Sequence, residues 1–110
     1  MIDKHLPFTG LLPGKSATST PAAVCDFDVP YQQFTVVATA GASTTAGTIT
    51  VTLSNDGTNY FTSTSSNTIA FTAAGTKALS LTNTPARFVK VAITTTFSGG
   101  TLTGASVAAA

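Results

Sequence analysis

The sequence predicts an all-β fold: a single antiparallel β-sandwich of about eight short strands with jelly-roll-like connections. Three observations support this prediction. Apolar and polar residues alternate with a period of two in several segments, which is typical of strands that bury one face. Turn-forming residues recur at roughly the 8–12 residue interval of sandwiches and barrels. No segment shows a capped helical pattern, and a chain of 110 residues fits one domain.

The first 15 residues are expected to form an irregular N-terminal arm ahead of a sandwich domain at residues 16–110, because proline and glycine interrupt any regular pattern there. The arm is nevertheless apolar. It therefore either packs along its own domain or docks on a neighbouring subunit, and the sequence leaves both interpretations open. If it docks, its candidate assembly contacts are Ile2, Leu6, Phe8, Leu11 and Leu12.

Two strands are expected before the middle of the chain, at residues 17–29 and 32–40. Val24 and Phe27 are the apolar anchors of the first strand, and Pro30 is expected to end it. In the second strand, aromatic and aliphatic residues alternate with threonine and smaller residues. A loop of small residues follows.

The clearest element is a hairpin in the centre of the chain. From Gly47 to Ser54, threonines alternate strictly with large aliphatic residues, so one face of this strand is apolar and the other carries hydroxyl groups. The sequence Ser54-Asn55-Asp56-Gly57 is typical of a turn, and the second strand is expected at residues 59–64.

The remaining strands follow the same alternation and are separated by Gly, Asn and Pro turns. They are expected at residues 67–73, 77–82, 87–97 and 101–109. Their inward-facing residues, with those of the earlier strands, form the expected core: Phe34, Val36, Ile49, Val51, Leu53, Ile69, Phe71, Leu79, Leu81, Val89, Val91 and Ile93.

The composition is poor in charge. Charged residues make up 8% of the chain, against about 25% in an average globular protein, and Thr, Ser and Ala replace them. Such a surface favours permanent assembly, so a homo-oligomer is expected, and a secreted or low-charge monomer is the alternative. The five basic residues are scattered, which argues against nucleic-acid binding, and no apolar run is long enough to span a membrane. No signal peptide is apparent, which favours synthesis in a cytoplasm.

The sequence offers little catalytic chemistry, and we expect no enzyme activity, no cofactor and no metal. The single histidine, His5, has no motif that pairs it with Cys25. Cys25 is expected to be a buried free thiol, and an intermolecular bridge or a reactive thiol is the alternative. Asp26 and Asp28 are two residues apart in a strand and are expected to share a solvated face. Calcium could use these acids with Asn55 and Asp56, but turn chemistry already accounts for the latter two. The threonine ladder lacks the repeat that ice binding requires.

Two segments resemble known proteins. Val51-Thr-Leu-Ser-Asn-Asp-Gly-Thr-Asn-Tyr-Phe61 resembles the S-x-D-G-x-N-[WY] hairpin of small β-sandwich structural proteins of tailed bacteriophages. Pro85-Ala-Arg-Phe-Val-Lys-Val-Ala-Ile93 is similar to the strand that follows in those proteins and in galactose-binding-like jelly rolls. With the strands around them, the resemblance covers residues 34–97.

The resemblance implies a bacteriophage virion structural protein, made in the host cytoplasm. The expected role is a capsid decoration or cement subunit that acts as a homo-oligomer and contacts other virion proteins, first the major capsid protein. The alternative is a glycan-binding module of a phage tail or fibre, whose candidate ligand loop would contain Tyr31, Asn55, Asp56 and Tyr60. The absence of tryptophan weakens that alternative.

Overall fold

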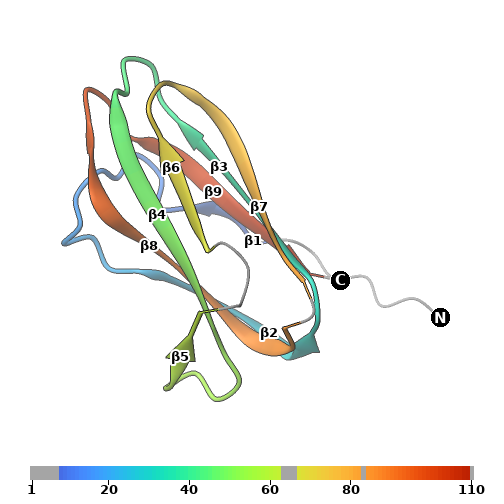
Figure 1. Ribbon diagram of the computed structural model, residues 1–110. Coiled ribbons are helices and arrows are strands. Elements are labelled where there is room, and N and C mark those ends of the chain that lie inside the picture. Colours follow the sequence, from blue (N-terminus) through green and yellow to red (C-terminus); the bar gives the residue numbers. More distant parts are fainter. Residues whose placement is uncertain (1–7, 63–66, 83, 110) are drawn as a thin grey trace.

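The computed structural model describes residues 8–62, 67–82 and 84–109, and it confirms the predicted all-β sandwich (Figure 1). Strands within these residues form two antiparallel sheets. The first sheet contains, in spatial order, β1 (Phe8–Leu11), β9 (Leu102–Ala109), β3 (Phe34–Ala40) and β7 (Gly75–Leu81). The second contains β2 (Ala23–Tyr31), β8 (Ala86–Ser98) and β4 (Ala46–Ser54) in that order. β5 (Tyr60–Phe61) and β6 (Thr68–Phe71) both pair with the edge of β4 that lies opposite β8. None of the described residues forms a helix that could span a membrane.

The strand connections are those of a jelly roll. β1 pairs with β9, β2 with β8, β3 with β7, and β4 with β5 and β6. The chain therefore folds back on itself as one long antiparallel hairpin, and its successive strand pairs belong alternately to the first and the second sheet. Pairing of β3 with β9 completes the first sheet, and pairing of β4 with β8 completes the second. β5 and β6 follow one another along the same side of β4 and act as one interrupted edge strand. The expectation of jelly-roll-like connections is therefore confirmed.

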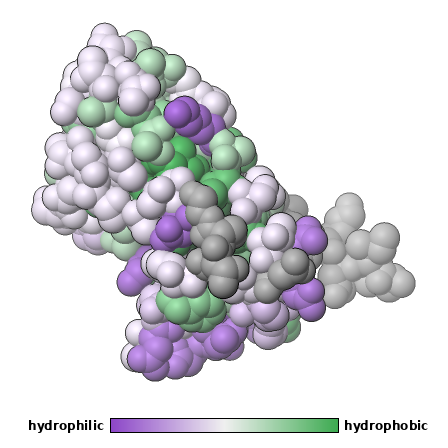
Figure 2. Space-filling model, in the orientation of Figure 1, coloured by the Kyte–Doolittle hydropathy of each residue, from purple (hydrophilic) through white to green (hydrophobic). Residues whose placement is uncertain are grey.

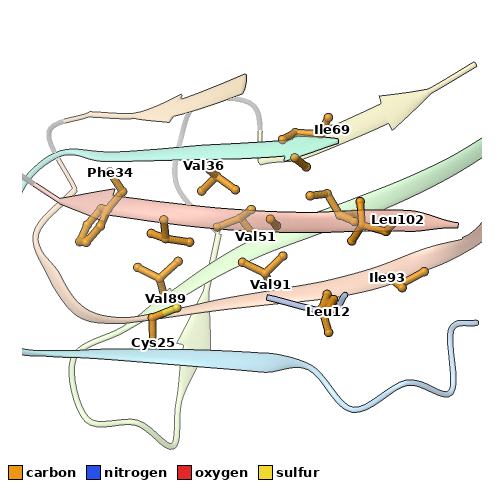
Figure 3. Close-up of a cluster of buried hydrophobic side chains, with 14 of the residues drawn as sticks. Leu12, Cys25, Phe34, Val36, Val51, Ile69, Val89, Val91, Ile93 and Leu102 are labelled. Carbon is orange, nitrogen blue, oxygen red and sulfur yellow. The ribbon is translucent and has the colours of Figure 1, made fainter. Parts of the chain in front are cut away.

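The core lies between the two sheets, and side chains from both point into it (Figure 3). Every residue of the expected core is buried except Leu79, which is only partly covered because β7 lies at the margin of its sheet. Cys25 is buried and free, as expected, and burial raises the pKa of its thiol to about 11. The core also contains larger residues that the expected set omitted: Leu12, Phe27, Phe97, Leu102 and Val107.

The expectation of an irregular arm over residues 1–15 is wrong for Phe8–Leu11, which forms β1 at the edge of the first sheet. The Phe8 ring meets Phe27 edge-on, with centroids 5.0 Å apart, and Leu12 is 7% exposed. Positive φ angles at Gly10 and Leu12 let the chain turn after so short a strand. The sandwich thus includes residues that precede the expected boundary at residue 15.

β2 also departs from its expected course. It begins at Ala23 and runs through Pro30 to Tyr31, because its pairing with β8 shifts between Asp26 and Tyr31. Asp28 has a φ of 71° within this bulge, and the alternation of buried and exposed residues is lost from Val29 onward. Asp26 and Asp28 still flank the buried Phe27 on the solvent side, as expected, but Asp28 lies in a bulge and not in a regular strand.

Candidate functional site

The turn of the central hairpin is held by hydrogen bonds between its own side chains and backbone. Ser54 ends β4 with its side chain 0% exposed, and its Oγ accepts the N–H groups of Asp56 and Gly57 at 3.2 and 2.9 Å. The same hydroxyl donates to Oδ1 of Asp56 at 2.9 Å. Oδ1 also accepts the N–H groups of Thr58 and Asn59, and Oδ2 accepts the Asn59 amide. These bonds, first that from the Asn59 N–H, hold the pKa of Asp56 well below its usual range.

This turn folds onto the outer face of the second sheet. Gly57 has a φ of 78°, and a Cβ placed on it would lie 3.1 Å from the ring of Phe88. Glycine at this position therefore satisfies two needs, the left-handed backbone and the close approach to an aromatic ring. The arrangement explains why Ser54, on the outward side of β4, is shielded from solvent.

Aromatic and cationic side chains lie beside the turn, in a group that we call the aromatic cluster: Tyr60, Arg87, Phe88 and Lys90. The Lys90 Nζ lies 4.1 Å from the centroid of the Tyr60 ring, and the Arg87 guanidinium carbon lies 4.8 Å from that of Phe88. Register places Tyr60, Ser54, Phe88 and Asp26 side by side across β5, β4, β8 and β2. Figure 2 shows strongly hydrophilic residues gathered near β5, whereas much of the visible surface has near-neutral hydropathy.

Asp26 fixes one end of this cluster. Its two carboxylate oxygens accept Nε and Nη2 of Arg87 at 2.7 and 2.9 Å, and Oδ1 also accepts the N–H of Asp28. The hydrogen bonds from Arg87, then that from Asp28, lower the pKa of Asp26 to about 2. Asp26 thus orients Arg87 over Phe88 and stabilises the β2 bulge, which are structural roles.

The structure brings together three of the four residues of the candidate ligand loop. Asn55, Asp56 and Tyr60 belong to one hairpin on the outer face of the second sheet. Tyr31 instead packs against the core, with its ring centroid 6.0 Å from that of Phe27. The described part of the chain contains no pocket and no group of three or more His, Cys, Asp or Glu side chains.

The candidate assembly contacts are also divided. Phe8, Leu11 and Leu12 pack on their own sandwich, which is the first of the two interpretations of the arm. Ile2, Leu6 and His5 lie outside the described residues.

Sequence reasoning missed a second surface, the outer side of the first sheet. Register groups its outward positions into three rows across β7, β3 and β9, and these nine residues are exposed or half-buried. We call them the uncharged face: Thr35, Val37, Thr39, Thr76, Ala78, Ser80, Gly104, Ser106 and Ala108. The hydroxyls of Thr39 and Thr76 are hydrogen-bonded at 2.9 Å across two of its strands. The small and polar residues that alternate with the core residues in these three strands could have identified the uncharged face from the sequence.

Comparisons with known proteins bear on the fold alone. No family model and no curated protein matches this chain. Among solved structures, the C-terminal domain of a chitobiase from Bacteroides fragilis is similar, with a TM-score of 0.58 and 16% sequence identity. The match covers 81% of this chain and 62% of the chitobiase domain, so this chain spans less than two thirds of the length of that domain. At this identity the likeness supports the β-sandwich architecture.

Proposed function

We propose that this chain is a structural subunit of a tailed-bacteriophage virion, a decoration or cement protein that binds the major capsid protein and stabilises the shell by contact. The observation that carries the proposal is the uncharged face, nine outward residues across three strands without one charged side chain. Such a face can be covered by another protein without leaving an unpaired charge in the interface, which is the costly outcome of burying polar surfaces.

The chemistry of the described residues supports a passive role. Asp26 is paired with Arg87, and Asp56 is bonded to four donors of its own turn. Both acids therefore have structural partners, and neither faces a pocket in the described part of the chain. A rigid, hydroxyl-rich sandwich of this kind is suited to contact between subunits.

The test uses purified particles of the phage or prophage that encodes the chain. The expected result is that the protein co-purifies with particles through a density gradient, and that particles lacking it release DNA at a lower temperature. Val37→Glu, at the centre of the uncharged face, should reduce retention on particles, because it places an unpaired carboxylate in the contact. Thr50→Glu on the outer face of the second sheet is the matched control and should be retained. A protein abundant in the lysate but absent from purified particles would refute the proposal.

The glycan-binding alternative has one observation in its favour: the half-buried Tyr60 belongs to the same hairpin as the exposed Asn55 and Asn59. A pyranose could pack its C–H face on such a ring, in competition with Lys90, while the Asn55 amide binds its hydroxyls, since the Asn59 amide is bonded to Asp56. Titration calorimetry with chito-oligosaccharides and galactosides tests this alternative, since it would require heat of binding that Tyr60→Ala removes and Thr58→Ala retains. Absence of binding to either class counts against it.

A further inference from the structure

Three of the four sheet edges carry features that hinder the addition of another strand. β1 has only four residues and a register shift. β2 contains the bulge with Asp28 and Pro30. The last edge is divided between β5 and β6, of two and four residues. Natural proteins use short strands, bulges and prolines at edges because an exposed row of unpaired N–H and C=O groups recruits other strands.

β7 lacks these features. Its seven residues pair with β3 without a register shift and include no proline, and among the described residues no other strand forms a backbone ladder with β7. Its first four residues and Ser80 are exposed. The only charged residue on β7 is Lys77, whose side chain reaches the second sheet: its Nζ donates to the carbonyl oxygen of Ala70 on β6 at 2.8 Å. Lys77 therefore hydrogen-bonds a backbone carbonyl at the edge of the opposite sheet, while no described strand pairs with the outer edge of β7.

We propose that β7 pairs antiparallel with β7 of a second copy of this chain, so that the two first sheets join into one eight-stranded sheet across a twofold axis. Strand addition needs an extended partner with complementary side chains, and this strand is complementary to itself. The proposal concerns the isolated chain in solution and does not depend on the virion role.

The side chains of β7 favour a register centred on Ala78. In that register Thr76 lies opposite Ser80 of the partner subunit, on the outer side of the joined sheet. Lys77 lies opposite Leu79 of the partner subunit, where its aliphatic part can contact the leucine while no like charges meet. The small residue Ala78 faces its own copy at the axis. The uncharged face then continues from one subunit to the other without interruption.

Charge substitutions at Ala78 provide the test, because the side chain is exposed and makes no contribution to the buried core. Sedimentation equilibrium from micromolar to millimolar concentration should show a dimer for the wild type. Ala78→Glu and Ala78→Lys should each weaken association by about tenfold or more, since like charges then meet at the axis. An equimolar mixture of the two variants should recover association. Ala108→Glu, on the same face but on β9, is the matched control and should dimerise like the wild type.

A cysteine substitution tests the register. Antiparallel neighbours have Cα atoms about 4.5–5.5 Å apart, which lies within the range of a disulfide. Ala78→Cys should therefore form a disulfide-linked dimer under mild oxidation with copper phenanthroline. Val37→Cys, one strand away from the edge, should not, because three strand spacings of about 4.8 Å separate the two copies. The native Cys25 is buried and gives no background. A wild type that stays monomeric throughout, or a dimer unaffected by Ala78→Glu, would overturn the proposal.

Discussion

Ser54→Ala should destabilise the domain by about 1–2 kcal/mol. The substitution removes a hydroxyl that is 0% exposed, accepts two backbone N–H groups and donates to Asp56. Unsatisfied donors in a buried setting cost about 1–3 kcal/mol. The lower part of that range applies because Asp56 and Gly57 are themselves exposed, so water can replace part of the lost bonding, and Asp56 keeps its bonds to Thr58 and Asn59.

Urea denaturation followed by circular dichroism measures this loss. With a slope of about 1–3 kcal/mol/M for a small domain, the midpoint should fall by about 1 M. Ser106→Ala is the matched control: the same atom is deleted from a partly buried serine that makes no side-chain hydrogen bond among the described residues. The control should stay within about 0.5 kcal/mol of the wild type. Equal midpoints for the two variants would show that the Ser54 hydroxyl does not hold the turn, and the reasoning would fail.

Four further outcomes follow from the structure. Leu102→Ala, at a position with 0% exposure, should cost about 2–5 kcal/mol in the same urea assay, and a loss under 1 kcal/mol would show that the two sheets are not packed as described. Gly47→Ala should destabilise by about 1–3 kcal/mol, because the added Cβ would lie 2.5 Å from the buried ring of Phe97; an unchanged midpoint would contradict that contact. Because the folded pKa of Asp26 is lowered to about 2, its ionised form stabilises the native state above about pH 4, and this contribution is lost as the pH falls toward 2; thermal melts should show a smaller loss over this range for Asp26→Asn. Cys25 should react with a thiol reagent only at the rate of unfolding, and rapid labelling of the native chain would contradict its burial.

The alternation of apolar and polar residues was sufficient to predict the fold class and most of the core, because a period of two specifies which side of a strand is buried. It could not predict β1, since a strand of four residues that contains Gly10 carries no detectable alternation. It also could not predict the β2 bulge. That bulge depends on contacts distant in sequence, above all on the Arg87 guanidinium held by Asp26, 61 residues away.

The candidate site was predicted in part. The Asn55-Asp56-Gly57 turn is local, and its chemistry can be inferred from residue types alone. The aromatic cluster is not local, because Tyr60 and Lys90 meet only once β5 and β8 both pair with β4. Tyr31 was assigned to the same loop, but its position on β2 directs it toward Phe27 and the core.

The hairpin motif that carries the resemblance to phage structural proteins is accounted for by folding alone. Ser54 and Asp56 bind the backbone of the turn, Gly57 permits the approach to Phe88, and Asn59 closes the Asp56 network. A motif whose polar groups bond to the turn itself predicts the local fold and does not predict what the protein binds. The residues that distinguish one function from another therefore lie outside the motif. We infer that they lie on the uncharged face and at the outer edge of β7. Ala78 belongs to both surfaces, whereas Val37 lies on β3, one strand away from the edge, so Val37→Glu separates them. Loss of particle retention by Val37→Glu with dimerisation intact would assign the face to the capsid and the edge to the second copy.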